Sequence, residues 1–345
     1  AVRKITTVRT ENTVGAIDLV LPPKYQYEDF SKCQIIEVWR EKQGQLELQN
    51  ETAYFLMDWE FTSSGGERLV RLMGFDANWL LATRIVAYDA GSAQAEMTDN
   101  ADDIMKAVVT DNLGGDATGT RDISTWLTIA SDLSDGQSLT KAFSRRNVLR
   151  VCQELAEAST SAGTRTYFDV VRTGIAEFTF RTYTGQRGVD HGRDSADVRL
   201  VGEQYGNFDD ITLGTYHSEE INYVYAGGQG TEGDREIVEV SDSDRINVGY
   251  PFNRVEGFAD ARHADTTAGV TAEGNALLRD GMPRQILTGR LNDTPGMQYG
   301  IHYGFGDIVS AEAFGYKVDC HVTSVKATYD ADNGETIDVR LRGEI

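Results

Sequence analysis

Apolar and polar residues alternate in two segments near the end of the chain, 316–326 and 336–342. The residues expected to share one face are Val318, Cys320, Val322 and Ser324 in the first segment, and Ile337, Val339 and Leu341 in the second. Such alternation is typical of β-strands with one buried and one solvated face. Asp332-Asn-Gly334 predicts a hairpin between them, because these residues tolerate positive φ angles. An earlier strand is expected at Ile308-Val309, after a turn at Gly306-Asp307.

The first 95 residues carry the same kind of pattern. Strands are predicted at 13–21, 31–40, 52–61 and 67–74, with a hairpin loop at 63–66. Pro22 and Pro23 stop the first of these strands, since proline has no backbone N–H to donate. The segment 74–86 is expected to begin as a helical turn and to end as a strand. Together these elements outline a meander or a small barrel.

Helical spacing of apolar residues predicts three helices, over 100–111, 145–159 and 272–279. The residues expected to cap them are Asp99 or Asn100, Ser144 and Thr271. Residues 118–136 are polar, with few periodic apolar positions, and predict a loop that holds Trp126. The chain therefore changes from strands to a mixed α/β character near residue 96.

Two further hairpins are predicted after the second helix. The first joins strands at 167–171 and 175–181 across Thr173-Gly174, and the second joins strands at 221–226 and 235–240 across the glycine-rich segment 227–233. The order of elements is β, then α/β, then β again. This order predicts two related barrels with the helical part inserted between them.

Composition and charge exclude some classes of function. The 345 residues suffice for two or three domains, and no run of about 18 apolar residues predicts a membrane span. The formal net charge is −21, which argues against a protein that grips nucleic acid through its phosphates. Cys33, Cys152 and Cys320 lie far apart and match no metal or disulfide pattern, so buried free thiols are expected.

The motifs in the chain favour structural roles. Gly227-Gly-x-Gly230 resembles a phosphate loop, but a strand follows it where a helix is required, so a hairpin loop is predicted. The five histidines are His191, His217, His263, His302 and His321, and no two have the i, i+4 spacing of a helical metal motif. We therefore expect no catalytic, cofactor-binding or metal-binding residues, and no cofactor.

Acidic pairs are frequent, as expected for a chain with 54 acidic residues. They include Asp102-Asp103, Asp209-Asp210 and Glu219-Glu220. A glycosidase needs two carboxylates on opposite sides of a cleft, which a sequence pattern cannot show. The densest polar cluster, 190–194, is read as an exposed loop that could order against a partner.

Short motifs in order along the chain resemble the hub, or tail-tip, proteins of long-tailed bacteriophages, which are similar to the baseplate hub of contractile-tailed phages. The motifs are Gly74-Phe-Asp76 with Leu80-Leu-Ala-Thr-Arg84, the helix 101–109 ending at Asn112, Arg146-Asn-Val-Leu149, Phe178-Thr-Phe-Arg181 with the loop 187–194, Glu220 to Gly228, Arg254 to Arg262, and Tyr303-Gly-Phe-Gly-Asp-Ile-Val309. Each motif is short, so the resemblance depends on their order over nearly the whole chain.

The resemblance implies an α+β, β-rich fold with two small hub-type β-barrel domains and α/β parts inserted between and beside them. Its domains would be a first barrel at 1–95, completed by part of the later chain, an inserted α/β domain at 96–218, and a second barrel at 219–345 with a short helical insertion near 271–281. It also implies that host binding and cell-wall digestion belong to other subunits, because the chain ends at Ile345.

The implied function is that of a structural, non-enzymatic virion protein in the viral tail. A homotrimer would form a ring that adapts the sixfold tail to threefold symmetry and lines or closes the DNA channel used for genome ejection. The implied partners are the distal tail ring protein, the tape measure protein and tail-tip or fibre proteins, with DNA passing without specific binding. The protein would be assembled in the bacterial cytoplasm and lie at the distal end of the tail.

The acidic composition suits this role, because negative channel walls would repel DNA phosphates, and three copies would carry three times the charge of one chain. Two other classes stay open at this point. A phage cell-wall or glycan-degrading enzyme predicts two carboxylates about 5–10 Å apart in a deep cleft. A receptor-binding protein at the fibre tip predicts an exposed aromatic patch away from the threefold axis.

Overall fold

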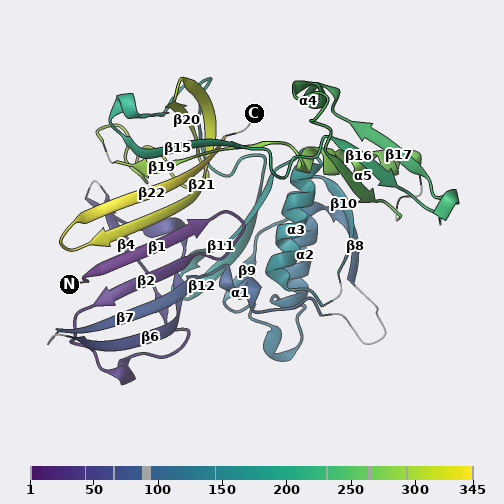
Figure 1. The fold of residues 1–345 in the computed structure, drawn as a ribbon. Helices are drawn as coiled ribbons and strands as arrows, with labels where there is room; N and C mark the ends of the chain where they lie inside the picture. Colours follow the sequence, from purple (N-terminus) through teal and green to yellow (C-terminus); the bar gives the residue numbers. More distant parts are fainter. Residues whose placement is uncertain are drawn as a thin grey trace. The chain divides into compact units, whose positions relative to one another are not determined.

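A computed structural model describes residues 2–42, 44–64, 67–87, 95–143, 145–230, 232–262, 264, 266–292 and 294–343. Its largest feature is a twelve-stranded sheet (Figure 1). The strands of this sheet are β1 (Lys4–Thr10), β2 (Ala16–Leu21), β3 (Ile35–Ile36), β6 (Tyr54–Ser64), β7 (Glu67–Asp76), β13 (Asp190–His191), β14 (Leu200–Val201), β15 (Phe208–Tyr216), β19 (Arg284–Leu291), β20 (Ile308–Ala313), β21 (Tyr316–Asp330) and β22 (Gly334–Gly343).

The order of strands joins the two ends of the chain. The main path runs β15-β19-β22-β21-β1-β2-β7-β6-β3, and β20 pairs with β21, β13 and β14 outside this path. The first strand, β1, pairs antiparallel with β21 over seven residues, from Lys4 opposite Asp330 to Thr10 opposite Ser324. Figure 1 shows this as purple β1 beside yellow β21. The N-terminal and C-terminal strands therefore build one sheet.

The remaining strands form four small sheets. They are β4 (Trp39–Lys42) with β5 (Gln45–Leu48), β8 (Ala95–Asn100) with β10 (Ser138–Phe143), β9 (Leu127–Ile129) with β11 (Thr166–Gly174) and β12 (Glu177–Thr184), and β16 (Tyr223–Gly227) with β17 (Ile237–Ser241) and β18 (Glu256–Asp260). The α-helices are α1 (Trp79–Ala82), α2 (Ala101–Asn112), α3 (Val148–Ser161), α4 (Ser243–Val248) and α5 (Thr267–Asp280). None of these helices is both long and apolar enough to span a bilayer.

Contacts between residues divide the chain into two compact units. The first contains most of residues 1–212 and 287–343, and the second is built mainly from residues 213–286. In the second unit α5 packs against β16, β17 and β18, and its buried core contains Ala226, Ala261 and Val270. These units do not test the predicted domain borders, which stay predictions.

The main hydrophobic core of the first unit lies between α2, α3 and the β9-β11-β12 sheet. Its members are apolar residues spaced three or four apart on the helices and two apart on the strands, so each element buries one face. They include Ile104, Val108, Val151, Leu155, Phe168, Val170, Phe178 and Phe180. A second cluster lies on the large sheet and contains Leu19, Leu21, Leu56, Val70 and Leu72.

Most predicted elements are confirmed, including the β-rich α+β character. Helix α2 begins one residue after the predicted start and ends one residue after the predicted end. The hairpin between β21 and β22 turns where Gly334 has a φ of 80°, and Gly306 before β20 has a φ of 86°. The hairpin loop between β16 and β17 is also confirmed. The predicted loop at 63–66 lies partly outside the described residues.

One prediction about β21 is wrong because the strand contains a bulge. The register shifts between Val322 and Ser324, so residues on opposite sides of Thr323 do not continue the same alternation. Val325 is therefore buried, and the Ser324 hydroxyl instead lies 2.8 Å from the hydroxyl of Thr10 on β1. A bulge adds one residue, which period-two reasoning from the sequence does not include.

Two helix starts differ from prediction because other residues cap them. Helix α3 begins at Val148, three residues late, and the Asn147 side chain accepts a hydrogen bond from the Arg150 N–H at 3.2 Å. Helix α5 begins at Thr267, and its cap is Thr266, whose hydroxyl accepts from the Gly269 N–H. Thr271 lies inside this helix. Ser144, the predicted cap of α3, lies outside the described residues.

Several loops and strands were also predicted wrongly. The segment 118–136 contains β9, which pairs parallel with β12, although Trp126 itself is half exposed. The β11–β12 turn lies at Ile175-Ala176, where Ala176 has a φ of 56°, and not at Thr173-Gly174. The strand predicted over 31–40 is interrupted, with only β3 and the start of β4 formed. Cys33 in this segment is exposed, whereas Cys152 and Cys320 are buried as expected.

Candidate assembly interface

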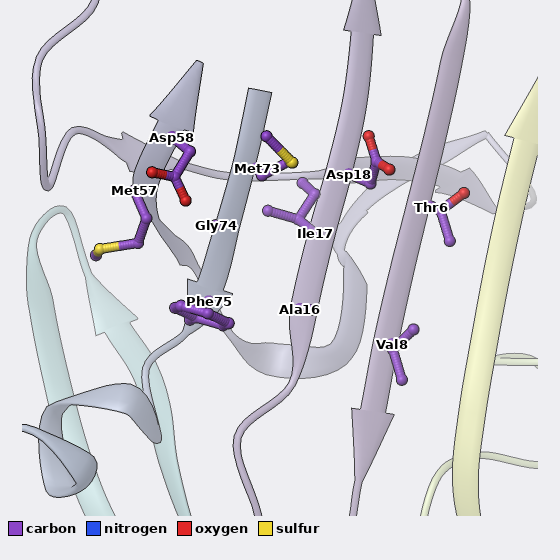
Figure 2. A pocket seen from close by; sticks show the side chains of 10 residues that line it. All are labelled: Thr6, Val8, Ala16, Ile17, Asp18, Met57, Asp58, Met73, Gly74 and Phe75. Carbon is purple, nitrogen blue, oxygen red and sulfur yellow. The ribbon is translucent and has the colours of Figure 1, made fainter. Parts of the chain in front are cut away.

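A shallow hollow lies on one face of strands β1, β2, β6 and β7 (Figure 2). Its volume is about 320 Å³, and most of its exposed lining is apolar. The residues that line it are Thr6, Val8, Ala16, Ile17, Asp18, Met57, Asp58, Met73, Gly74 and Phe75. Phe75, at one end of the hollow, is 40% exposed. The hollow is thus an apolar area on a sheet face that would ordinarily be solvated.

Two features of the strands shape this hollow. Gly74 pairs with Ile17 on one side and Leu56 on the other, and an added Cβ would lie 2.4 Å from the Phe55 carbonyl oxygen. Only glycine fits such a close approach. The register between β6 and β7 shifts between Leu56 and Asp58, so Met57 is an extra residue. Its side chain is half-buried, packs against the main core and lines one part of the hollow.

The rim of the hollow is charged. The Arg71 guanidinium donates to both carboxylate oxygens of Asp18, with an Nη2–Oδ2 distance of 2.5 Å, and both side chains are exposed. Asp58 lies at another part of the rim. An apolar centre with a polar rim is the usual composition of a protein–protein interface.

The outer edge of β6 lies beside an exposed group of aromatic side chains. Strand β3 pairs only with Tyr54 and Phe55 of β6, and no other described strand pairs with this edge as far as Ser64. The ring of Tyr27 lies 5.7 Å from those of Trp59 and Phe61, and Tyr27 is 60% exposed. An unpaired edge next to exposed aromatic residues is a place where another chain can add.

A buried charge cluster holds this part of the sheet against the β11–β12 hairpin. Arg9 on β1 and Arg187 after β12 both donate to Oδ2 of Asp169 on β11, at 2.7 and 2.5 Å. The Asn78 amide donates to the other carboxylate oxygen at 3.1 Å. The side chains of the two arginines and the aspartate are each less than 10% exposed. Every oxygen of Asp169 therefore has a partner, which is the condition for burying a charge.

Phe305 extends the cluster to the turn before β20. The guanidinium carbons of Arg9 and Arg187 lie 4.6 and 4.7 Å from the centre of its ring, within the range of a cation–π interaction. Arg187 also donates to the Phe305 carbonyl at 3.1 Å. Four segments that are far apart in the sequence therefore meet in one buried group.

Burial shifts the pKa values of carboxyl groups in and near this cluster. Burial disfavours the charged form of Asp169, but the two guanidiniums and its hydrogen bonds hold its pKa below the usual range. Burial, together with the negative charge of Asp169, raises the pKa of Asp76 to about 7. Burial also raises the pKa of Glu11 to about 7. The cluster therefore contains one strongly ionised carboxylate and two carboxyls that titrate near neutral pH.

The polar segment 190–194 takes part in the large sheet. The 190–194 segment is not simply an exposed loop, because Asp190 and His191 form β13 and pair with β20. His191 is buried, and its Nδ1 lies 2.9 Å from the Asp197 carbonyl oxygen. The 190–194 segment is therefore ordered by strand pairing within the same chain. His263 lies outside the described residues.

The three acidic pairs have different surroundings. Asp209 and Asp210 form ion pairs with Arg290 near the surface, and Glu220 is buried and accepts from His217 at 2.7 Å. Asp102 and Asp103 are buried at the start of α2, with Asp132 beside them.

The sequence contained signals for residues that our reading missed. Asp169 is a charge inside the apolar run Tyr167-Phe-Asp-Val-Val171, which indicates a buried partner of opposite charge. Met73 and Phe75 are large apolar residues at the positions of β7 that face away from the Leu72 side. Neither signal identifies the partner, because the partners come from other parts of the chain.

A family model and several solved structures both relate this chain to phage proteins. The family model described as "Siphovirus ReqiPepy6 Gp37-like protein" matches residues 1–341. A comparison with curated proteins gives no match. Three solved structures have the same fold over 99% of this chain. They are a tail protein from Neisseria meningitidis MC58 (TM-score 0.63, 13% identity, 92% of that chain covered), the 43 kDa tail protein of prophage MuSo2 from Shewanella oneidensis (0.63, 12%, 93%) and prophage tail protein gp18 from Listeria monocytogenes EGD-e (0.53, 10%, 88%).

The charge cluster predicts the effect of removing its central carboxylate. We expect Asp169→Ala to lower the free energy of unfolding by about 3–5 kcal/mol, because two buried guanidiniums lose their nearest carboxylate, and the exposed Glu51, 3.8 Å from Arg9 and 3.6 Å from Arg187, replaces it only in part. Asp18→Ala is the matched control, and loss of its exposed ion pair with Arg71 should cost less than about 1 kcal/mol. Urea unfolding measures both. Equal losses in the two variants would contradict the importance of the cluster.

The raised pKa of Asp76 predicts a pH dependence of stability. Its pKa of about 7 in the folded state lies above the ordinary aspartate pKa of 3.8, so the folded state binds more protons than the unfolded state between these values. The stability that the folded state gains from binding this proton is fully present below pH 3.8 and is lost as the pH rises through 7. Asp76→Asn should therefore gain stability relative to the wild type between pH 4 and pH 8, by roughly 2–4 kcal/mol. If the free energies of unfolding of the two proteins change in parallel with pH over this range, the raised pKa of Asp76 is refuted.

Proposed function

Because the chain belongs to the Siphovirus ReqiPepy6 Gp37-like family of phage tail proteins, we propose that it is a structural hub subunit of the tail tip. In this proposal three copies form a ring at the distal end of the tail. The ring adapts the sixfold tail to threefold symmetry and lines or closes the DNA channel. Family membership confirms the resemblance found in the sequence, and the hub role is the specific proposal.

The observation that carries this proposal is the combination of an apolar hollow and an unpaired β6 edge on the same end of the large sheet. A sheet that works alone in water usually protects its edge and keeps its outer face polar. We assign the hollow to contact with a second copy of this chain. A closed ring uses two different surfaces of each copy, and the hollow with its β6 edge would be one of them.

The twelve-stranded sheet supports the proposed pair of barrel-like parts. The β1–β21 pairing divides it into an N-terminal half with β2, β7, β6 and β3 and a C-terminal half with β22, β19, β15 and β20. In a trimer there would be six such halves, matching the six subunits of a tail ring. The domain borders at residues 95 and 218 belong to this proposal.

The charge of the chain supports the proposed passage of DNA. A formal charge of −21 makes the surface repel phosphates, so DNA would pass without binding. Met73 and Phe75 would be poorly placed on a wet channel wall, which is a further reason to assign the hollow to a protein contact. The acidic walls of the channel would come from other faces of the subunit.

The proposal includes partners and excludes catalysis as the main role. A hub would contact the distal tail ring, the tape measure protein and tail-tip or fibre proteins. Host binding and wall digestion would be carried out by other subunits. The protein would enter the virion after assembly in the host cytoplasm.

The hollow predicts which substitution disrupts the ring. We expect the wild-type protein to give three times the chain mass of 38.1 kDa in light scattering, and Met73→Glu to give the mass of one chain. A charge in the apolar centre of an interface must be desolvated without a partner, which weakens association by at least about tenfold. At protein concentrations low enough for the wild-type trimer to dissociate, the urea unfolding of the two proteins should match, because Met73 is only half-buried in the isolated chain.

Ile175→Glu is the matched control, because Ile175 is 87% exposed at the β11–β12 turn and lies outside the hollow. This variant should assemble like the wild type. A stable dimer of the wild type would contradict the hub proposal. If the Met73→Glu variant is still a trimer, the hollow does not take part in the interface.

A further inference from the structure

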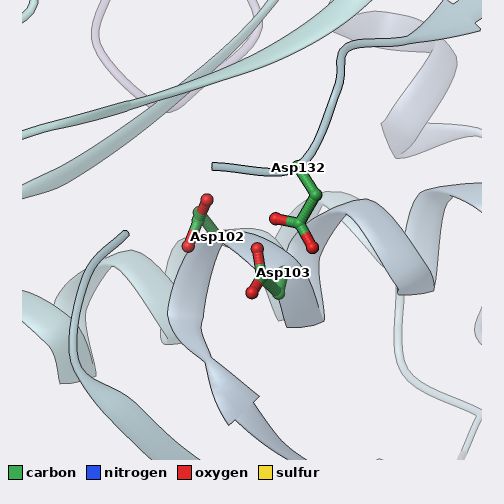
Figure 3. Close-up of side chains that lie close together, drawn as sticks. All are labelled: Asp102, Asp103 and Asp132. Atoms are coloured by element: carbon green, nitrogen blue, oxygen red, sulfur yellow. The ribbon is translucent and has the colours of Figure 1, made fainter. Parts of the chain in front are cut away.

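Three carboxylates converge at the start of α2 (Figure 3). Asp102 and Asp103 lie in the first turn of the helix, and Asp132 comes from the segment between β9 and β10. Each residue offers one oxygen, and these oxygens lie within 4.8 Å of one another. Among the described residues this is the only group of histidine, cysteine and acidic side chains with such spacing.

Two of these carboxylates are buried and have an oxygen with no partner. Asp102 is 1% exposed and Asp103 is 8% exposed. The Oδ1 atoms of both residues have no hydrogen-bond partner within the described structure. An ionised oxygen that is buried without a partner has a large desolvation cost. In Figure 3 the Asp103 carboxylate is directed toward that of Asp132, so a bound cation could supply the missing partner.

Lys106 compensates only part of this charge. Its ammonium lies 3.1 Å from Oδ2 of Asp102 and 3.6 Å from Oδ1 of Asp132. One positive charge thus faces three carboxylates, and the described residues provide no ion pair for Asp103. The helix dipole favours acidic residues in a first turn, but it does not explain why Asp132 joins them.

We propose that Asp102, Asp103 and Asp132 form a binding site for a divalent cation, and that this cation is Ca²⁺. All three ligands are carboxylates, which are typical of hard cations and not of zinc or copper. The three oxygens come from a helix turn and a separate segment and lie within 4.8 Å of one another. Ca²⁺ accepts such irregular sets of oxygen ligands, whereas Mg²⁺ requires a near-ideal octahedron and usually keeps several waters.

Bound Ca²⁺ would fasten the segment before β10 to the start of α2. Two hydrogen bonds already join these parts, from the Asn100 amide to the Ser134 carbonyl at 2.8 Å and from the Ala101 N–H to the Gln137 carbonyl at 3.0 Å. The cation would add bonds from Asp132 to the buried pair. The site does not depend on the hub proposal, because all its ligands belong to one chain.

Calcium binding can be measured on the chelator-treated full chain by titration calorimetry and thermal unfolding. We expect a dissociation constant below about 1 mM and a rise in melting temperature with Ca²⁺. Asp103→Asn should weaken binding at least about tenfold and abolish that rise. In the presence of chelator, the same variant should melt above the wild type, because it removes a buried charge without a partner.

Asp135→Asn is the matched control, because Asp135 is an exposed residue of the same segment and is not a ligand. It should bind Ca²⁺ like the wild type. Lys106→Met should bind Ca²⁺ more tightly, since a competing charge is removed. The proposal is overturned if the wild type shows neither heat nor a melting shift at about 10 mM Ca²⁺, or if Asp103→Asn binds equally well. Equal affinity for Mg²⁺ would contradict the assignment to calcium.

Discussion

The antiparallel pairing of β1 with β21 is the contact on which the rest of the first unit depends. It joins Lys4 to Asp330 and Thr10 to Ser324 across more than three hundred residues of intervening chain. Without it, the twelve-stranded sheet would separate into an N-terminal and a C-terminal half. A contact of such long sequence separation must offset a large loop-closure entropy, so it requires support from burial nearby. The buried charge cluster provides part of that support, because Arg9 belongs to β1.

The cluster also explains how distant segments keep one arrangement. A guanidinium is buried at a cost that only well-placed acceptors offset, and Asp169 is the acceptor for both arginines. Phe305 lies against both guanidiniums and joins the turn that precedes β20. These contacts keep the strands that carry Met73 and Phe75 in one arrangement. A surface that is already ordered loses less conformational entropy when it binds a partner, so its affinity for that partner is higher.

The sequence predicted the elements better than the contacts between them. The α2 helix and the β21–β22 hairpin follow from local periodicity and turn residues, and local signals suffice for such features. The Thr323 bulge and the Asn147 cap depend on neighbouring strands and loops, so the pattern alone placed those boundaries wrongly.

The candidate interface and the charge cluster could be predicted only in part. The unusual residues were visible, such as Asp169 within an apolar strand and Met73 on a strand face expected to be polar. Their meeting with Arg9, Arg187 and Met57 requires the order of strands in the sheet, which periodicity does not specify. The resemblance to tail hub proteins came from the order of short motifs, and the family model over residues 1–341 confirms a phage tail protein.

An acidic subunit with an apolar hollow and an open β6 edge combines two properties that a ring around DNA requires. Its formal net charge of −21 disfavours binding to phosphates, while the apolar hollow can be buried against another protein. Averaged images of the virion's tail tip, with this subunit labelled, test the central claim most directly. The account predicts threefold density for this subunit at the distal end of the tail, around the channel. Sixfold density, or a position on peripheral fibres away from the axis, would contradict it.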